Sequence, residues 1–301
     1  MGGLPADLGL ITCAVIWSAH APLDGGTHSD VPQHRDTETG GTDVRGPDDG
    51  GVGNLAYLLW GSDPDLVMLH GFSDAALCWS PLVGVLNSTV LAIDARGHGH
   101  SGLDSGDISP VSQAEDVAMV LDALDLQRCT VVGHSMGAST AAALAGARPD
   151  LVGALVLEEP SPGGGDPSSR RPVPGWLMHM RSLSLDDAVA WCRAEYPYWP
   201  DDELVPWAQA KHQLNLAVFD QPKPASPTLA SLIQEVRCPT LLIRGSGLAS
   251  VLDDQVITDC KAVGSHIETV AIAAGHNVRR DARTAYTTTV QAWLRERNQA
   301  R

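Results

Sequence analysis

Short β-rich runs alternate with longer helical patterns along most of the chain, and this alternation constrains the fold more than any other feature. Strand-like runs lie at 55–60, 65–70, 90–94, 129–132, 153–158, 240–244 and 267–272. Helical patterns lie between or after them, at 75–86, 112–124, 138–147 and 284–297. A helix between two strands returns the chain to the edge of the sheet where the first strand began, so the strands pair in parallel. The sequence therefore predicts an α/β fold with a mostly parallel twisted sheet and helices on both faces.

The alternation stops between Pro160 and about Ala230. This stretch has no β-rich run; it contains proline-rich joints, helical patterns at 185–195 and 202–215, and tryptophans at 176, 191, 199 and 207. We interpret residues 161–230 as a helical cap, or lid, inserted into a core formed by residues 54–160 and 231–301. Most of the tryptophans would pack inside the cap, but a cap over a cleft also presents some apolar surface to the ligand.

The first 53 residues differ in composition from the rest of the chain. Residues 22–53 are rich in Gly and Asp with few apolar anchors, so residues 1–53 are predicted to form a flexible N-terminal extension. The apolar run Leu8–Trp17 is too short to span a membrane. No Lys or Arg precedes it, which argues against a secretory signal and favours a cytoplasmic protein.

Charge and cysteine content limit the partners. The 301 residues include 20 basic and 36 acidic side chains, a formal net charge of −16. Such a charge repels nucleic acid and anionic membranes, so we expect neither as a partner. The six cysteines are scattered without a C-x-x-C pair, which predicts reduced thiols rather than a zinc site or a disulfide framework.

The stretch VVGHSMGAST at 131–140 places Ser135 between two glycines where a strand-like run meets a helical pattern. Residues 133–137 fit the pattern G-x-S-x-G. In a nucleophile elbow the serine occupies a strained strand-to-helix turn, and the glycines let neighbouring backbone pass without a Cβ clash. The alternative is a glycine-bounded loop whose serine only caps a helix.

Four stretches occur in a distinctive order: LHGF (69–72), DARGHGHS (94–101), GHSMG (133–137) and AGHN (274–277). Together they resemble the α/β-hydrolase superfamily over residues 55–297. The resemblance implies the α/β-hydrolase fold, Ser135 as the nucleophile, and the backbone N–H groups of Phe72 and Met136 as the oxyanion hole. It implies no metal and no organic cofactor. A serine nucleophile argues against the dehalogenase and epoxide-hydrolase branches, in which the covalent ester forms on a carboxylate.

A serine hydroxyl needs a base within hydrogen-bond reach and a third group that orients the base. We identify the base as His276, because it follows a late strand at the edge of the sheet where open α/β sheets place their sites. Asp94 and Arg96 are interpreted as a structural loop braced by charge pairing. The competing histidines are also interpreted as structural: His70, His98, His100 and His134.

The acid departs from the commonest pattern in these hydrolases. Many relatives carry an aspartate just after the strand that corresponds to TLLIRG (240–245), but here the next carboxylates are Asp253 and Asp254. A minority take the acid from the strand after the elbow helix, which here ends in Glu158 and Glu159. Side chains alternate along a strand, so only one of the two would reach His276, and we favour Glu159. The stretch at 137–160 also resembles the corresponding part of the zearalenone-type lactonases, which use a glutamate acid 24 residues after the serine, the spacing that Glu159 has from Ser135. Asp253, Asp254 and two merely solvated glutamates stay open as alternatives.

These features predict a carboxylic ester hydrolase, an esterase or lactonase, with a Ser135–His276–Glu159 triad. It would cleave a small apolar ester or lactone through an acyl-enzyme. Two alternatives stay open: a cofactor-free lyase or perhydrolase with the same elbow, and a non-catalytic ligand-binding protein on a hydrolase scaffold.

Overall fold

The computed structural model describes residues 48–103, 107–164, 172–220 and 227–299. All of them belong to one compact unit that spans residues 46–301. Most of the predicted N-terminal extension (1–47) and two parts of the predicted cap (165–171 and 221–226) lie outside the described residues. None of the helices in the described part is both long enough and apolar enough to cross a membrane.

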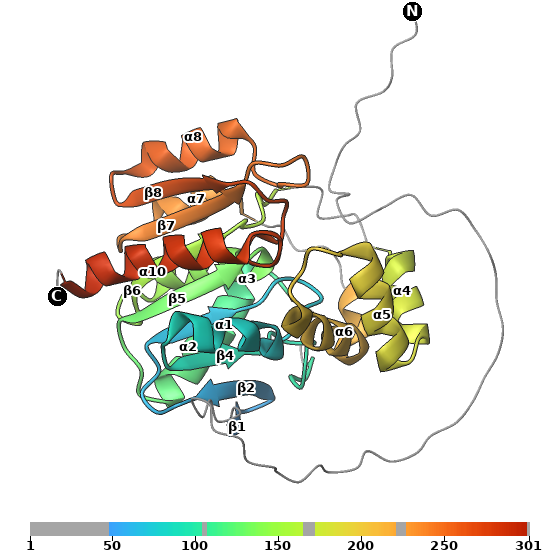
Figure 1. Cartoon of the computed structure of the whole chain (residues 1–301). Helices are drawn as coiled ribbons and strands as arrows, with labels where there is room; N and C mark the ends of the chain where they lie inside the picture. The colour runs from blue at the N-terminus through green and yellow to red at the C-terminus, as the bar shows by residue number, and fades with distance from the viewer. Residues whose placement is uncertain (1–47, 104–106, 165–171, 221–226, 300–301) are drawn as a thin grey trace, which may run out of the picture. The chain divides into compact units, whose positions relative to one another are not determined.

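In the described residues, eight strands form one sheet in the order β1-β2-β4-β3-β5-β6-β7-β8 (Figure 1). The strands are β1 (Asp48–Val52), β2 (Leu55–Trp60), β3 (Leu66–Leu69), β4 (Val90–Ile93), β5 (Cys129–His134), β6 (Val152–Glu158), β7 (Thr240–Gly245) and β8 (Ile267–Ile272). Only the β1–β2 and β2–β4 pairs are antiparallel, and every pair from β4 to β8 is parallel. The predicted mostly parallel sheet is therefore confirmed. Strand β1 uses residues that we had assigned to the N-terminal extension.

Helices cover both faces of the sheet, because successive residues of a buried strand point to opposite sides. The helices that surround the sheet are η1 (Ala76–Trp79), α1 (Ser80–Leu86), α2 (Pro110–Ala123), α3 (Met136–Ala147), α7 (Leu229–Gln234), α8 (Asp254–Val263) and α10 (Arg283–Gln299). In β3, Val67 and Leu69 share a core cluster with residues of α2, α3, α7 and α8. Leu66 and Met68 share a second cluster with residues of α1 and α10. Both predicted helical layers are thus present.

The segment between β6 and β7 is helical where it is described. Its elements are α4 (Gly175–Ser182), α5 (Leu185–Glu195), η2 (Asp201–Glu203), α6 (Leu204–Gln213) and η3 (Leu216–Phe219), and we call them the inserted helices. Helices α5 and α6 lie side by side (Figure 1). Met180, Cys192, Trp199 and Trp207 are buried in a cluster that belongs to the inserted helices alone. The insertion therefore has a core of its own.

Five of the cysteines lie in the described residues, and all five are free thiols: Cys78, Cys129, Cys192, Cys238 and Cys260. Burial raises the pKa of Cys78 and of Cys260 to about 11. A thiol with such a pKa stays protonated and unreactive near neutral pH, so these cysteines serve as small core residues.

Candidate active site

Ser135 lies between β5 and α3, at a turn that the flanking glycines make possible. Its φ and ψ are 51° and −112°, outside the regions that residues with side chains favour. A Cβ on Gly137 would lie 2.2 Å from the Leu69 carbonyl oxygen, and a Cβ on Gly133 would lie 2.5 Å from the Gly137 carbonyl oxygen. The Ser135 side chain makes no capping hydrogen bond to α3. The geometry is therefore that of a nucleophile elbow rather than of a helix-capping serine.

His276 lies in the loop between β8 and α9 (Val278–Asp281), with its Nε2 atom 3.0 Å from the Ser135 hydroxyl oxygen. His134, beside the serine, donates from its own Nε2 to the His276 carbonyl oxygen at 3.1 Å. Burial holds the pKa of His134 well below its ordinary value, so its ring is neutral. The residue before the serine thus fixes the backbone of the histidine loop.

Glu159 is fully buried at the end of β6, and its Oε2 atom lies 3.2 Å from Nδ1 of His276. Its φ of 46° is unusual for a residue with a side chain and occurs where the chain leaves the strand. Contacts therefore run without a break from the Ser135 hydroxyl through the His276 ring to the Glu159 carboxylate. The structure brings together the three residues that the sequence predicted as a triad.

The last residue of β7 and the loop after it surround the Glu159 carboxylate with donors. Oε1 accepts hydrogen bonds from the Gly245 N–H and the Ser250 hydroxyl, both at 2.7 Å, and Oε2 accepts one from the Val251 N–H at 2.8 Å. This loop is the one that carries the acid in many of the hydrolases that the sequence resembles. Ser250 is not among the predicted site residues; its one signal in the sequence is a hydroxyl in a loop, 246–252, that lacks a carboxylate.

The other acidic candidates have different partners. Asp253 caps α8 by accepting from the Val256 N–H at 2.8 Å. Asp254 pairs with Arg244 at 2.6 Å, and its side chain is 91% exposed. Glu158 is fully buried and accepts from the Arg279 N–H at 2.7 Å. Glu159 is the carboxylate that lies against His276, at 3.2 Å from its Nδ1 atom, and so the geometry favours Glu159 among the alternatives.

The turn Gly71–Asp74 follows β3 and carries Phe72, one of the two predicted oxyanion donors. A Cβ on Gly71 would lie 3.3 Å from the Ser135 Cβ, so this turn runs directly beside the serine. The Asp74 N–H closes the turn on the Gly71 carbonyl at 3.0 Å. Met136, the other predicted donor, is the first residue of α3, where backbone N–H groups point out of the helix end.

The remaining motif residues brace loops. His70 donates from Nδ1 to the Gly71 carbonyl at 2.9 Å and accepts from the Ala95 N–H at Nε2 at 3.0 Å. Burial lowers the pKa of His70 to about 4 and that of His98 to about 3, so both rings are neutral. Asp94 accepts from two backbone N–H groups, while Arg96 pairs with Asp116 at 2.6 Å. The charge pairing that we expected in this loop is therefore made with α2.

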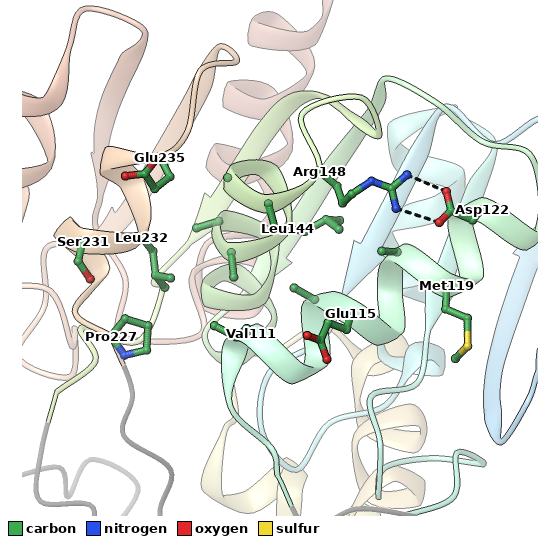
Figure 2. A pocket seen from close by; sticks show the side chains of 16 residues that line it. Val111, Glu115, Met119, Asp122, Leu144, Arg148, Pro227, Ser231, Leu232 and Glu235 are labelled. Atoms are coloured by element: carbon green, nitrogen blue, oxygen red, sulfur yellow. Dashed lines mark hydrogen bonds and ion pairs between the residues drawn. The ribbon is translucent and has the colours of Figure 1, made fainter.

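A separate groove of about 840 Å³ lies between α2, α3 and α7. Figure 2 shows Val111, Glu115 and Met119 on its α2 side and Leu232 and Glu235 on its α7 side. Its lining residues do not include Ser135, His276 or Glu159, so this groove is separate from the candidate active site.

Comparisons with known proteins find relatives of this chain. A family model described as the alpha/beta hydrolase family matches residues 66–287, more than half of the chain. The chain is 41% identical over 113 residues to esterase Rv0045c of Mycobacterium tuberculosis, covering 37% of this chain and 38% of that protein. It is 34% identical over 142 residues to the sn-1-specific diacylglycerol lipase ABHD11 of Mus musculus, covering 45% of each. The chain thus spans less than half the length of these two relatives.

A longer match is to a protein that is named for a different activity. The chain is 30% identical over 203 residues to a Bacillus subtilis protein named, provisionally, as a 2-succinyl-6-hydroxy-2,4-cyclohexadiene-1-carboxylate synthase, covering 60% of this chain and 72% of that protein. Among solved structures, that of the M. tuberculosis esterase Rv0045c has a TM-score of 0.63 at 24% identity, over 84% of this chain and 93% of that one. At this identity the structural likeness concerns the fold alone.

Proposed function

Because the chain belongs to the alpha/beta hydrolase family, we propose that it hydrolyses a small apolar carboxylic ester or lactone through an acyl-enzyme on Ser135. Relatives named as an esterase and as a lipase support hydrolysis of an ester bond. The observation that carries the proposal is the run of contacts from the Ser135 hydroxyl to His276 (3.0 Å) and on to Glu159 (3.2 Å). A serine held by an oriented histidine is an activated nucleophile.

In the proposed reaction, Nε2 of His276 takes the hydroxyl proton while the Ser135 oxygen attacks the carbonyl carbon. Negative charge develops on the former carbonyl oxygen, where the N–H groups of Phe72 and Met136 stabilise it. Collapse of this intermediate expels the alcohol, which receives the proton from His276 and leaves the acyl group on Ser135. Nε2 of His276 then takes a proton from water, whose oxygen attacks the acyl carbon; the carboxylic acid leaves as the Ser135 oxygen takes that proton from His276.

Glu159 has a constant role in both halves of this reaction. Its Oε2 atom accepts the Nδ1 proton of His276, which leaves Nε2 free to accept the serine proton, and its charge stabilises the imidazolium that forms. The donors from the loop after β7 hold the carboxylate in one orientation. The steps use side chains and backbone amides of this chain and call for neither a metal nor a cofactor.

We further propose that residues 161–230 act as the cap over this site. The Phe72 ring meets Phe219 of η3 edge-on, with the ring centroids 5.3 Å apart. Leu103, Val218 and Trp176 belong to the same apolar cluster. Apolar side chains from the inserted helices thus gather over the predicted oxyanion turn, which supports an apolar substrate. With a net charge of −16, a small neutral substrate fits better than nucleic acid or an anionic membrane, and a cytoplasmic location stays our prediction.

A cofactor-free lyase is the second candidate, and the Bacillus subtilis relative favours it. A lyase with this elbow would show little acyl-enzyme with activated esters. The two candidates therefore differ in whether Ser135 becomes acylated.

The test combines covalent labelling with a substrate panel. A fluorophosphonate probe should label Ser135 in the wild type and not in Ser135→Ala, and a panel of activated esters and lactones of graded acyl length should show burst kinetics with the wild type only. Labelling without ester or lactone turnover would favour the lyase. Absence of both labelling and turnover would refute the proposal and leave a ligand-binding role on the hydrolase scaffold.

A further inference from the structure

Six charged side chains are buried together beside the candidate active site, and we call them the buried ion cluster: Asp74, Glu158, Glu203, Lys211, Arg279 and Arg280. Three carboxylates balance three cations. The members come from the turn after β3, the end of β6, the inserted helices and α9. Burial of an unpaired charge is costly, so the members have to stay in mutual contact. The cluster therefore ties the inserted helices to the loops on both sides of Ser135.

Lys211 is the member that reaches the predicted oxyanion turn. It extends from α6, and its Nζ atom donates to the Ser73 carbonyl at 2.7 Å and to Asp74 Oδ1 at 2.9 Å. The residue is only 2% exposed, and its ammonium lies 4.7 Å from the centre of the Trp207 ring. Two of the four residues of the turn are thus held by one side chain of the inserted helices.

The turn has a physical need for such a contact. Ser73 has a φ of 65°, a left-handed conformation that normally belongs to glycine or asparagine at this position of a turn. A strained backbone of this kind persists only where surrounding contacts determine it. The turn's own closing bond, from the Asp74 N–H to the Gly71 carbonyl, is one such contact, and the Lys211 ammonium supplies the next two.

We propose that Lys211 is a positioning residue for the oxyanion hole, because it locks the Gly71–Asp74 turn and so aims the Phe72 N–H at the reacting oxygen. This role rests on the proposed function, which assigns that N–H to the oxyanion. It makes the inserted helices part of the catalytic geometry, in addition to any contact that they make with substrate. An oxyanion donor acts on the transition state, so loosening it lowers kcat and leaves KM nearly unchanged.

Lys211→Met is the informative variant, because it removes the ammonium from the turn while Asp74, the carboxylate partner of Lys211, stays paired. Asp74 keeps Arg279 and Arg280, each at 3.0 Å from its Oδ2 atom. Burial would raise the pKa of Asp74, but the cations Arg280, Lys211 and Arg279 hold that pKa well below its ordinary value, and two of these three cations remain in the variant. The methionine side chain is close to lysine in length and suits the apolar wall formed by Trp207. Lys261→Met, on the exposed side of α8, is the matched control.

The experiment measures kcat and KM on an activated ester, with the active fraction of the protein counted by fluorophosphonate labelling. It also measures the Kd of an arylboronic acid that forms a tetrahedral adduct on the serine. We expect Lys211→Met to lower kcat by about tenfold to 10², since a complete loss of one oxyanion donor costs about 10² to 10³. The KM should change by less than about twofold, and the boronic acid Kd should rise by the same factor as kcat falls. If Lys211→Met does not fold, Lys211→Gln replaces it in the same assays. The glutamine side chain is too short for its amide to reach the Ser73 carbonyl.

A purely structural contact would give a different result. It would lower the melting temperature and the yield but leave kcat and the boronic acid Kd, per labelled molecule, equal to those of Lys261→Met, and this outcome overturns the inference. A change confined to KM overturns it as well, because it would place Lys211 in substrate binding. If the wild type neither hydrolyses esters nor reacts with the fluorophosphonate, the proposed function and the inference are both refuted. If the wild type is active and Lys211→Met has the same kcat, only the inference is refuted.

Discussion

Replacing Glu159 by glutamine removes one charge and almost no volume, so it isolates the contribution of the proposed acid. The carboxylate lies 3.2 Å from Nδ1 of His276 and is fully buried. Two unit charges about 4 Å apart interact by about 4 kcal/mol at an effective dielectric constant of about 20. The imidazolium that forms during turnover loses this stabilisation in Glu159→Gln, which corresponds to a fall in kcat of about 10³, within a range of about 10² to 10⁴.

The hydrogen bonds around residue 159 add a cost to stability. Ser250, Gly245 and Val251 all donate to the carboxylate, and a glutamine offers only one oxygen to accept from them. Its NH₂ group has to face at least one backbone N–H, which costs about 1–3 kcal/mol for an unsatisfied donor. We therefore expect Glu159→Gln to melt at a lower temperature than the wild type as well as to turn over slowly.

The assay is kcat on an activated ester at saturating substrate, with the folded fraction fixed by circular dichroism. Asp253→Asn and Asp254→Asn are the controls, because asparagine is as good a helix N-cap as aspartate and Asp254 is 91% exposed. Each control should cost less than about tenfold. A crippled Asp253→Asn or Asp254→Asn beside an active Glu159→Gln would refute the assignment of the acid and restore the commoner layout.

Three further changes test other parts of the structure. Ser250→Ala removes the hydroxyl that donates to Glu159 and should lower kcat by about two- to tenfold. The control is Ser246→Ala, which alters an exposed side chain of the same loop. Equal kcat values for the two variants would show that the Ser250 hydroxyl is dispensable. Burial lowers the pKa of His70 to about 4 from about 6.5, so the unfolded chain takes up this proton at a higher pH than the folded chain does. As the pH falls from about 6.5 to about 4, the free energy of unfolding therefore decreases by up to about 3 kcal/mol. In urea titrations His70→Gln should lack this part of the decrease, and an unchanged pH dependence would contradict a neutral buried ring. A chain that starts at residue 54 loses β1 and leaves β2 as an unpaired edge, so it should melt a few °C below a chain that starts at residue 46, and equal melting temperatures would show that β1 adds nothing.

The parts of the fold that the sequence predicted are those with a local signature. Apolar runs of four to seven residues between helical patterns marked the buried strands, and the Gly133–Gly137 pattern marked the elbow, because the close approach of backbone at both glycines excludes any side chain. The position of Glu159 followed from alternation at the end of β6 and from a family resemblance. The structure places it against His276, and its catalytic role stays a prediction that the variants above test.

The parts that the sequence did not predict depend on contacts between distant residues. Lys211 and Asp74 are 137 positions apart, and Arg279 and Asp74 are 205 apart. The helical pattern around Lys211 would be the same whether its side chain were exposed to solvent or buried against the turn after β3. The sequence of α6 therefore could not reveal this contact. Strand β1 was missed altogether for a related reason: its sequence, DDGGV, has low strand propensity and is a strand through its pairing with β2.

The location of the acid can itself be tested by moving it back to the loop after β7. Strands β6 and β7 are neighbours, and the Glu159 N–H donates to the Ile243 carbonyl at 2.8 Å, so the ends of the two strands lie side by side. The Ser250 hydroxyl oxygen lies 2.7 Å from Glu159 Oε1, and an aspartate at 250 would extend into the space that Glu159→Ala vacates.

The same substitution should therefore have opposite effects in two backgrounds. Added to Glu159→Ala, Ser250→Asp should raise kcat at least about tenfold above Glu159→Ala with Ser250→Ala, because it restores a carboxylate beside Nδ1 of His276. Added to the wild type, it sets two carboxylates side by side in a buried site and should lower both kcat and the melting temperature. Equal kcat values for the two double variants would show that an aspartate at position 250 does not reach His276. In that case only the end of β6, and not the loop after β7, could supply the acid.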